Sequence, residues 1–184
     1  MCVILYKPRG VVMDLDLFDL CARDNPDGIG FAFPAALKLV GIMKALWKTE
    51  ELINSYKFIL GEVGDKDMVF HFRKATAGKI IKPNCHPFRI VSSLAFCHKG
   101  HLTCVDPDPK GVKSDTVIFR DRYLKGMKAE DLNDTALLQK ISDFIGKDNT
   151  LVFLNAAGKV AVCNDNGFWK YGIWFSNQID FSLL

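Results

Sequence analysis

The chain begins Met1-Cys2-Val3-Ile4-Leu5-Tyr6-Lys7-Pro8, a run of five apolar residues after the initiator that lysine and proline close. The β-branched and aromatic residues in this run favour a buried strand over residues 2–6. The run is far too short for the apolar core of a signal peptide or for a membrane span. We therefore expect a cytoplasmic protein without membrane contact, whose first element is a strand that starts at a cysteine.

Cys2 could combine a nucleophile and a base in one residue. The small side chain at position 2 allows removal of Met1, which would leave a thiol and a free α-amine on the same residue. A model α-amine has a pKa of about 7.7–8.0 and a model thiol one of about 8.5, so near neutral pH much of the amine could accept the thiol proton. Such a nucleophile needs no separate histidine. The alternative is a small buried hydrophobe, since cysteine is commonly buried.

Composition narrows the class of protein. The 184 residues, 49% hydrophobic and 24% charged, are typical of one globular domain whose core needs no metal or disulfide. A net charge of +3 with scattered basic residues argues against nucleic acid as a partner. In a reducing compartment the six cysteines stay free. The sequence has no phosphate-binding glycine loop and no dinucleotide fingerprint, so we expect no cofactor.

The order of predicted elements is β-rich, then helical, then β-rich. Helical spacing and capping residues predict helices over residues 49–60, 114–124 and 134–145. Apolar runs between turn signals predict strands over residues 2–6, 28–33, 37–46, 68–72, 91–97, 150–155, 160–163 and 171–176. This order favours an α+β protein with helices covering two sheets over a doubly wound fold. The core is expected to hold the three tryptophans, Trp47, Trp169 and Trp174.

Polar residues with possible chemistry follow the predicted strands. Arg73 and Thr76 come after strand 68–72, where their donors could converge on a carboxylate, which arginine binds bidentately; the alternative for Arg73 is a surface ion pair. His98-Lys99-Gly100 follows another strand, and its glycine could bring a backbone N–H to an oxyanion, although a plain β-turn would look the same. Ser114-Asp115 offers a carboxylate for an ammonium group, or simply a helix N-cap.

Taken together, these motifs resemble one family. They are Met1-Cys2, Asn25-Pro26-Asp27-Gly28-Ile29-Gly30, His71-Phe72-Arg73-Lys74-Ala75-Thr76-Ala77-Gly78, Asn84-Cys85-His86-Pro87-Phe88, His98-Lys99-Gly100 and Ser114-Asp115. In this order and spacing, the chain from Met1 to about Leu124 resembles the class II glutamine amidotransferases, whose glutaminase domain is an N-terminal nucleophile hydrolase. The resemblance implies a four-layer αββα sandwich, with residues 1–184 as a single glutaminase domain. Because the chain ends at Leu184 without a synthase domain, ammonia would pass to a partner polypeptide or escape.

The resemblance also implies the catalytic residues. Freed of Met1, Cys2 would attack the side-chain amide of glutamine and form a thioester while ammonia leaves, its own amine shuttling the proton. Gly100 would give its N–H to the oxyanion. The family usually has His-Asn-Gly at this point, so Lys99 stands where an asparagine supplies the second oxyanion donor. Loss of such a donor commonly costs about 10²–10³ in rate, whereas a lysine aimed inward could replace it.

The substrate-binding residues follow in the same way. Arg73 would clamp the α-carboxylate of glutamine with help from Thr76 and the backbone around Ala77, and Asp115 would pair with the α-ammonium. Ala77 replaces a more polar residue that the family often has after the threonine. The two departures, at Lys99 and Ala77, leave open an N-terminal nucleophile hydrolase that acts on another amide, or a catalytically silent relative.

A function of another class would be a zinc-binding module. The possible ligands crowd into twenty residues: Cys85, His86, Cys97, His98, His101 and Cys104. Structural zinc sites favour ligand pairs two to four residues apart. Here Cys85-His86 and Cys97-His98 are adjacent pairs that would point to opposite faces of a strand. We therefore expect no metal site.

Overall fold

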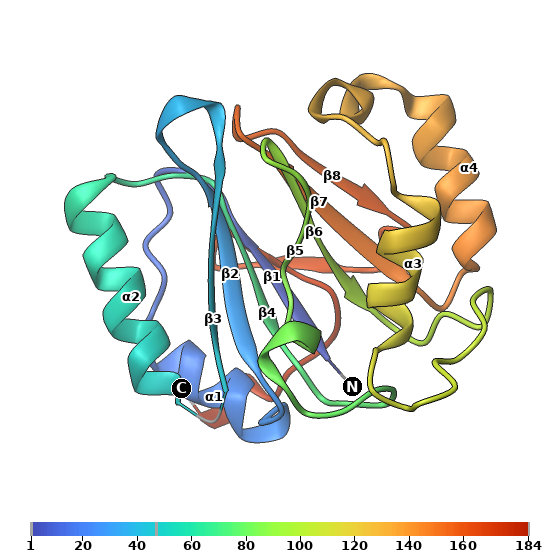
Figure 1. Cartoon of the computed structure of the whole chain (residues 1–184). Coiled ribbons are helices and arrows are strands. Elements are labelled where there is room, and N and C mark those ends of the chain that lie inside the picture. Colours follow the sequence, from blue (N-terminus) through green and yellow to red (C-terminus); the bar gives the residue numbers. More distant parts are fainter. Residues whose placement is uncertain (1, 47, 184) are drawn as a thin grey trace.

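Two antiparallel sheets form the centre of the computed structural model, which describes residues 2–46 and 48–183 (Figure 1). The larger sheet has the strand order β3-β2-β4-β1-β10-β9 and the smaller one the order β5-β6-β7-β8. The strands of the larger sheet are β1 (Val3–Lys7), β2 (Ile29–Pro34), β3 (Val40–Ala45), β4 (Met68–Phe72), β9 (Phe168–Lys170) and β10 (Ile173–Phe175). Those of the smaller sheet are β5 (Phe88–Val91), β6 (Leu94–Lys99), β7 (Thr150–Asn155) and β8 (Val160–Cys163).

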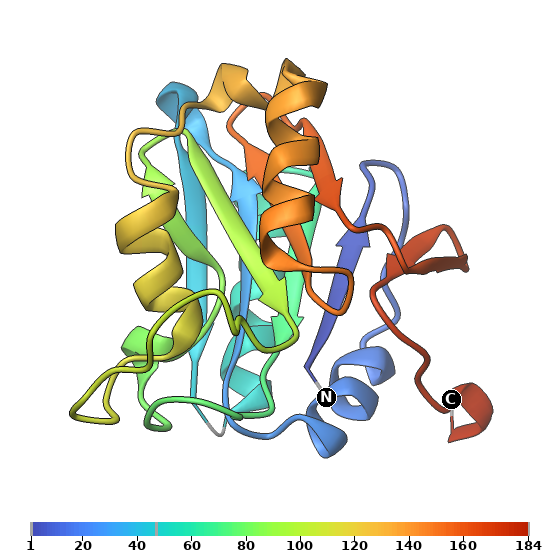
Figure 2. The same cartoon turned by 90° about the vertical axis from the view of Figure 1, so that its right-hand side faces the viewer.

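Helices cover the outer faces of both sheets (Figures 1 and 2). On the larger sheet lie α1 (Asp16–Asp24) and α2 (Thr49–Glu62), and on the smaller sheet α3 (Asp115–Tyr123) and α4 (Thr135–Ile145). Short 3-10 helices occur at Ala36–Lys38, Lys82–Asn84, Ala129–Asn133 and Phe181–Leu183. The expectation of an α+β protein with helices on two sheets is confirmed.

Apolar clusters account for this layering. Phe18 of α1 and Tyr56 of α2 pack with Phe70 on the outer face of the larger sheet. On the smaller sheet, Phe119 of α3 packs with Phe153 in a separate cluster. A further cluster lies between the sheets and contains Ile4, Ala32, Val69, Ala95, Cys97, Val152, Leu154 and Trp174. The residues of each sheet therefore contribute to two hydrophobic layers.

The alternation of side chains along the strands decides what faces the space between the sheets. In β1, Val3 and Leu5 pack toward the helices, and Ile4 packs toward the smaller sheet. Because side chains alternate along a strand, Cys2, directly before β1, falls on the side of Ile4. In β6 the same rule places Cys97 between the sheets and His98 on the side of the helices. The start of β1 thus presents a cysteine at one end of the sandwich.

Several predicted boundaries differ from the structure. The strand expected over 37–46 begins only at β3, because a 3-10 turn precedes it with Leu37 at φ 59° and Lys38 at φ 58°. The strand expected over 91–97 is a hairpin of β5 and β6, which turns between Val91 and Leu94. Helix α1 and strand β9 were not predicted. The other predicted strands and helices are present within a few residues of their expected ends.

The tryptophans divide between core and surface. Trp174 is buried between the sheets, as expected. Trp169, in contrast, is 59% exposed and lies edge-on against Tyr6, so its assignment to the core was wrong. Trp47 lies outside the described residues. Within the described ranges, we find no helix that combines the length and the apolar character needed to cross a bilayer.

Candidate active site

A narrow pocket lies at the end of the sandwich where β1 begins and β4 ends. The register pairs Val3 with Phe72, so Cys2 and Arg73 are brought together just beyond this pair. The pocket is lined by Cys2, Arg73, Lys74, Thr76, Ala77, His86, His98, Gly100, Ser114, Asp115 and Thr116. Its volume of about 20 Å³ has room for about one water molecule. Of the predicted site residues, only Lys99 is missing from this lining.

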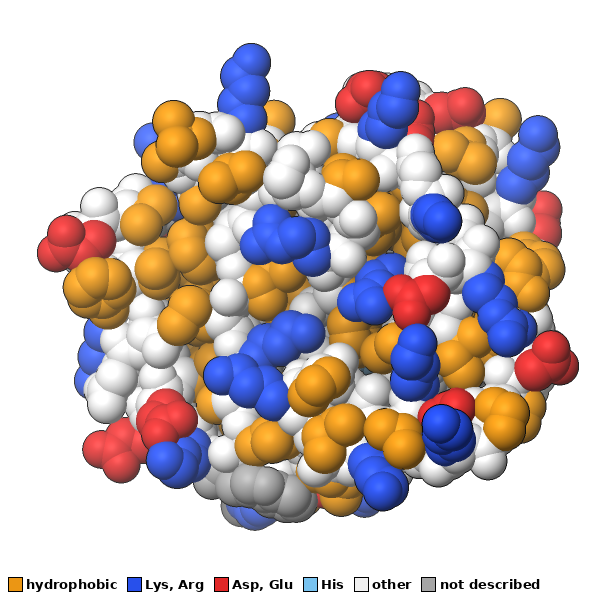
Figure 3. Space-filling model, viewed as in Figure 1, with side chains coloured by type: hydrophobic (Ala, Val, Ile, Leu, Met, Phe, Trp, Pro, Cys, Tyr) orange, Lys and Arg blue, Asp and Glu red, His pale blue; other side chains and the backbone are white. Residues whose placement is uncertain are grey.

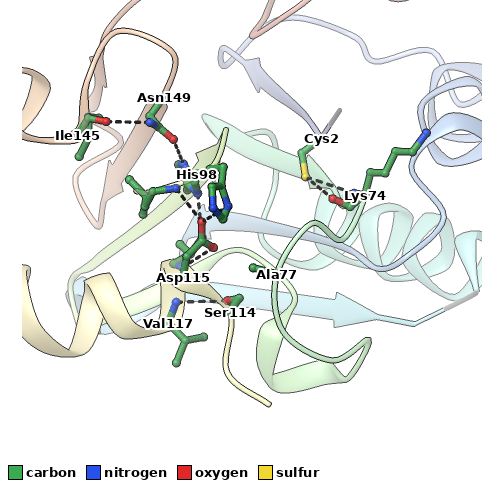
Figure 4. Close-up of polar contacts among 12 residues, drawn as sticks. Cys2, Lys74, Ala77, His98, Ser114, Asp115, Val117, Ile145 and Asn149 are labelled. Carbon is green, nitrogen blue, oxygen red and sulfur yellow. Dashed lines mark hydrogen bonds and ion pairs between the residues drawn. The ribbon is translucent and has the colours of Figure 1, made fainter. Parts of the chain in front are cut away.

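Cys2 is held by the backbone of the segment that follows β4 (Figure 4). The amide of Lys74 donates to Sγ at 3.2 Å, and the thiol donates to the carbonyl of Lys74 at 3.2 Å. Burial raises the pKa of the Cys2 thiol, whereas the Lys74 amide and the Arg73 guanidinium oppose this rise less strongly. The sulfur is therefore positioned, but it needs a base to ionise at neutral pH.

Arg73 is a buried cation that borders the pocket. Its side chain is only 3% exposed, and its guanidinium donates to the carbonyls of Ala77 at 2.9 Å and Lys79 at 3.4 Å. Among the described residues, no carboxylate forms a salt bridge with it. Burying a charge is costly unless an opposite charge compensates it. The alternative of a surface ion pair for Arg73 is thus not found in the described structure, in which the guanidinium is bonded to main-chain carbonyls and has no anionic partner.

The loop after Arg73 is fixed from two sides. Asp27 accepts from the amide of Ala75 at 2.8 Å, which ties the Asp27-Gly28 turn to the segment that holds Cys2. Asn84 donates to the carbonyls of Lys79 at 2.8 Å and Val112 at 2.7 Å. The loop therefore closes the pocket by hydrogen bonds to neighbouring segments.

Gly78 packs that loop against the start of α3. It has φ +71°, and a Cβ atom built there would lie 2.6 Å from the amide nitrogen of Ser114. No L-residue fits at this distance without displacing backbone. Glycine at position 78 is therefore required for the closed position of the loop.

Asp115 lies across the pocket from Cys2 (Figure 4). Its carboxylate accepts from the backbone amides of Leu102 at 2.8 Å and Thr116 at 2.7 Å, and His101 Nδ1 lies 3.4 Å away. Ser114 forms the N-cap of α3, accepting from Val117 at 3.3 Å, so the N-cap interpretation is correct for Ser114. Thr116 Oγ1 also donates to the Asp115 carboxylate at 3.2 Å, so these three hydrogen bonds leave about one of its four acceptor sites for a further donor.

Gly100 and Lys99 end β6 in different surroundings. Gly100 has φ +130° and leaves no room for a Cβ atom, which would collide with Asn149 Oδ1. The backbone can therefore approach the pocket closely at this position. Lys99 is half-buried, and its ammonium makes no hydrogen bond or salt bridge with the described part of the chain. The structure brings Gly100 to the pocket and leaves Lys99 beside it.

Three buried histidines form a stack at the pocket, and only two of them, His86 and His98, were grouped by the sequence, as possible zinc ligands. His71 of β4 stacks on His86 with ring centroids 3.9 Å apart, and His98 follows at 6.3 Å from His86. Burial lowers the pKa of His71 to about 3 and also lowers the pKa values of His86 and His98. All three rings are therefore neutral at physiological pH.

Hydrogen bonds assign the tautomers of His71 and His86. The amide of His98 donates to His86 Nδ1 at 3.0 Å, so the proton of the neutral His86 ring is on Nε2. His71 donates from Nε2 to the carbonyl of His98 at 3.0 Å, which leaves its buried Nδ1 without a partner among the described residues. His86 Nε2 makes no hydrogen bond to the described chain, although the ring lines the pocket. A neutral ring with an N–H donor thus lines the same pocket as Cys2.

The proposed zinc ligands do not assemble. In the described ranges, no three His, Cys, Asp or Glu side chains are grouped as a metal ion would need. Cys85 and His86 lie in a loop before β5, not on a strand as assumed, and His101 is exposed. All six cysteines lie in the described part of the chain and are free thiols.

Comparisons of the sequence with known families and proteins found no match, whereas comparison of the structure found similar structures. No protein-family model matches the chain. No curated protein matches its sequence. Among solved structures, the chain is similar to a glutamine aminotransferase class-II domain protein from Silicibacter pomeroyi, with a TM-score of 0.47 and 14% identity, over 95% of this chain and 87% of the other.

Proposed function

We propose that this chain is a glutaminase of the class II glutamine amidotransferase type, built on the αββα sandwich of the N-terminal nucleophile hydrolases. The observation that carries the proposal is one pocket lined by Cys2, Arg73 and Asp115. It joins a nucleophile, a buried unpaired cation and a buried carboxylate. A free amino acid carries an α-carboxylate and an α-ammonium, and it therefore complements the two opposite charges.

Substrate binding requires a change in the pocket. Its volume of about 20 Å³ is too small for an amino acid, and the Arg73 guanidinium is occupied by the Ala77 and Lys79 carbonyls. In our proposal, glutamine replaces these carbonyls as the partner of Arg73, and the loop 76–79 moves outward. Thr76 and the backbone at Ala77 then border the bound carboxylate, while Asp115 accepts from the α-ammonium.

The chemistry follows from the position of the sulfur. After loss of Met1, the α-amine of Cys2 takes the thiol proton, and the Lys74 amide donates to the thiolate. The sulfur attacks the side-chain carbonyl, a C–S bond forms, and the amine returns the proton to the departing ammonia. Water, deprotonated by the same amine, then hydrolyses the thioester to glutamate and the free thiol.

The developing oxyanion needs donors aimed at it. Gly100 supplies its N–H in this proposal, as the resemblance implies. For the second donor, we favour the Nε2–H of His86 over Lys99, because His86 lines the pocket and Lys99 does not. The lysine at the usual asparagine position is then compatible with turnover.

The proposal also covers the extent of the domain, the fate of the ammonia and the need for a cofactor. Residues 1–184 are proposed as one glutaminase domain or subunit, which passes ammonia to an acceptor enzyme. No cofactor takes part in these steps.

A labelling experiment with a matched cysteine tests the function. Wild type, Cys2→Ala and Cys104→Ala are treated with a glutamine-analogue electrophile and analysed by intact mass, and their glutaminase activity is assayed. We expect one label and activity in wild type and in Cys104→Ala, whose half-buried thiol lies outside the pocket. Cys2→Ala should have neither. Processed protein starting at Cys2 that takes no label and releases no ammonia would contradict the proposal and indicate a silent relative.

A further inference from the structure

A basic groove lies on the face of the sandwich where the edge strands β3 and β5 meet α3 (Figure 3). Lys and Arg side chains gather across the middle of this face, among hydrophobic ones. One hollow of about 420 Å³ is lined by Lys44, Lys82, Arg89 and Arg120. A second hollow of about 320 Å³ shares Arg89 and Arg120 with the first and adds Lys125. The two hollows are adjacent, because both are lined by Arg89 and Arg120, and together they are called the basic groove.

Acidic residues do little to neutralise this groove. The lining of the first hollow contains no Asp or Glu. The second contains Asp121, whose carboxylate is bonded to Arg120 at 2.6 Å and lies 3.4 Å from the ammonium of Lys113. Arg120 is therefore partly neutralised by Asp121, whereas Lys44 and Lys82 form no salt bridge with an acidic side chain among the described residues.

The basic side chains are held in place. Arg89 donates to the carbonyls of Val40 at 2.7 Å and Ser92 at 2.9 Å, which fixes its guanidinium between the two sheet edges. The Lys44 ammonium lies 4.6 Å from the centre of the Phe88 ring, and the Arg120 guanidinium lies 5.6 Å from the same ring. Such placement reduces the entropy that a ligand must remove on binding.

The pKa of Lys44 reflects its burial among other cations. Its pKa is lowered to about 8, chiefly by burial and to a smaller degree by the charges of Arg120 and Lys82, while Cys85 and Cys97 act in the opposite direction. An anion in the groove would offset the repulsion from these neighbouring cations and favour the charged form of Lys44. Phosphate groups fit this need, because they carry multiple charge and accept several hydrogen bonds from Lys and Arg.

We propose that the groove binds the phosphate groups of a small polyphosphate ligand, held by Lys44, Lys82 and Arg120. Ile42, Met43 and Pro87 supply an apolar wall of the same hollow, which favours an organic body attached to the phosphates. The hollow has the size typical of small-molecule sites. The proposal is independent of the chemistry at Cys2.

The groove and the catalytic pocket share a wall. His86 lines the pocket, and the next residue, Pro87, lines the groove. The Lys44 charge also contributes to the lowered pKa values of His71 and His86. A ligand in the groove is therefore expected to alter the reactivity of the pocket, although its binding does not depend on that effect.

Calorimetric titration of the full chain tests the site. The probes are inorganic pyrophosphate and ATP, without added metal, at about 0.1 M salt, where nonspecific charge attraction is screened beyond about 10 Å. We expect saturable binding of one ligand per chain with a Kd below about 1 mM. Tighter binding of ATP than of pyrophosphate would identify an organic ligand, and the reverse order a free polyphosphate. Proton uptake should accompany binding near pH 8, seen as a dependence of the enthalpy on buffer.

Single substitutions test whether the ligand binds in the groove and not elsewhere on the surface. Lys82→Gln and Arg120→Gln should each weaken binding by about tenfold or more, since hydrogen bonds to charged groups commonly contribute about 1.5–3 kcal/mol. Lys140→Gln, at an exposed lysine on α4, is the control and should bind as wild type does. Lys82 is exposed, so its replacement does not threaten folding. Absence of saturable binding, equal weakening by Lys140→Gln, or tighter binding of single-stranded RNA than of ATP would overturn the proposal.

Discussion

The sulfur of Cys2 lies 3.2 Å from both the amide nitrogen and the carbonyl oxygen of Lys74. The main chain thus fixes the thiol at the pocket before any substrate is bound. Because burial raises the thiol pKa, position alone does not make the sulfur reactive at neutral pH. The proposed function therefore depends on the α-amine of the same residue.

A cleavable N-terminal extension tests this dependence. With the extension attached, Cys2 has no free amine, so we expect almost no labelling by the glutamine-analogue electrophile near pH 7. Protease cleavage that leaves Cys2 first should restore labelling and activity. The measurement is intact mass over time on both forms. Equal labelling rates before and after cleavage would show that the amine is not the base.

Arg73→Gln tests the carboxylate clamp through substrate preference. Wild type should prefer glutamine to its α-carboxamide analogue by about ten- to hundredfold in kcat/KM, since hydrogen bonds to charged groups contribute about 1.5–3 kcal/mol. The variant should lose this preference, because its side chain no longer distinguishes a carboxylate from an amide by charge. A preference that survives in a folded Arg73→Gln protein would place the carboxylate elsewhere.

Substitutions at His86 and Lys99 separate the two possible oxyanion donors. His86→Phe keeps a ring against His71 but removes the N–H donor, so kcat should fall by about 10²–10³ with little change in KM. Lys99→Ala and Lys99→Asn should leave kcat unchanged, since Lys99 is outside the pocket lining. Steady-state kinetics on the three variants gives the answer. A large loss in Lys99→Ala alone would assign the role to the lysine.

Gly78→Ala tests whether the closed position of the loop contributes to substrate binding, and Gly64→Ala serves as the matched control. Gly78 and Gly64 have φ +71° and +77°, but only at Gly78 would a Cβ atom meet backbone, at 2.6 Å. Gly64→Ala should lower the free energy of unfolding by about 1–2 kcal/mol through left-handed strain, and Gly78→Ala should lower it by more, because its Cβ also meets backbone. Only Gly78→Ala should also raise KM for glutamine, because the loop beside Arg73 moves. Similar KM values in the two variants would exclude a role of the loop in binding.

The buried histidines predict how stability depends on pH. The pKa of His71 is about 3 in the folded chain and about 6.5 when unfolded, so between these values the unfolded chain binds a proton that the native chain does not. Stability is therefore full above about pH 6.5 and falls as pH falls, by about 1.4 kcal/mol per pH unit for each such group.

Urea unfolding between pH 7.5 and 5 measures this slope. His71→Gln should make the slope shallower by about 1.4 kcal/mol per pH unit. Lys140→Gln, which changes an exposed side chain of α4, serves as the control and should keep the wild-type slope. An unchanged slope in His71→Gln would mean that His71 is charged in the native chain.

Much of the fold could be predicted because strand and helix periods are local. The predicted helix over 134–145 corresponds to α4, which Asp134 caps and Gly146 ends. Helix α1 was not predicted, because Leu15, Leu17 and Phe18 alternate with acidic residues. Their spacing matches neither the pattern of a strand nor the apolar face of a long helix. The left-handed pair Leu37 and Lys38 carries no glycine signal, so the late start of β3 was not predictable either.

Less of the candidate site could be predicted from the sequence, because its residues come from segments far apart in the chain. The resemblance selected Cys2, Arg73 and Asp115, and they line one pocket, but their roles stay predictions. The histidine stack could not be found from the sequence, because β4, a loop and β6 each contribute one ring. Only the packing of the two sheets and the path of the loop before β5 bring these rings together.

The partition formed by His86 and Pro87 has a consequence for engineering this protein. A substitution at either residue changes the wall of both the pocket and the groove. A change that alters ligand binding in one of them is therefore expected to alter binding in the other. Residues on the outer rims, such as Lys82 and Thr76, belong to one compartment only. In a mutational library selected for altered ligand preference, tolerated changes should therefore accumulate on the rims and avoid the dividing pair.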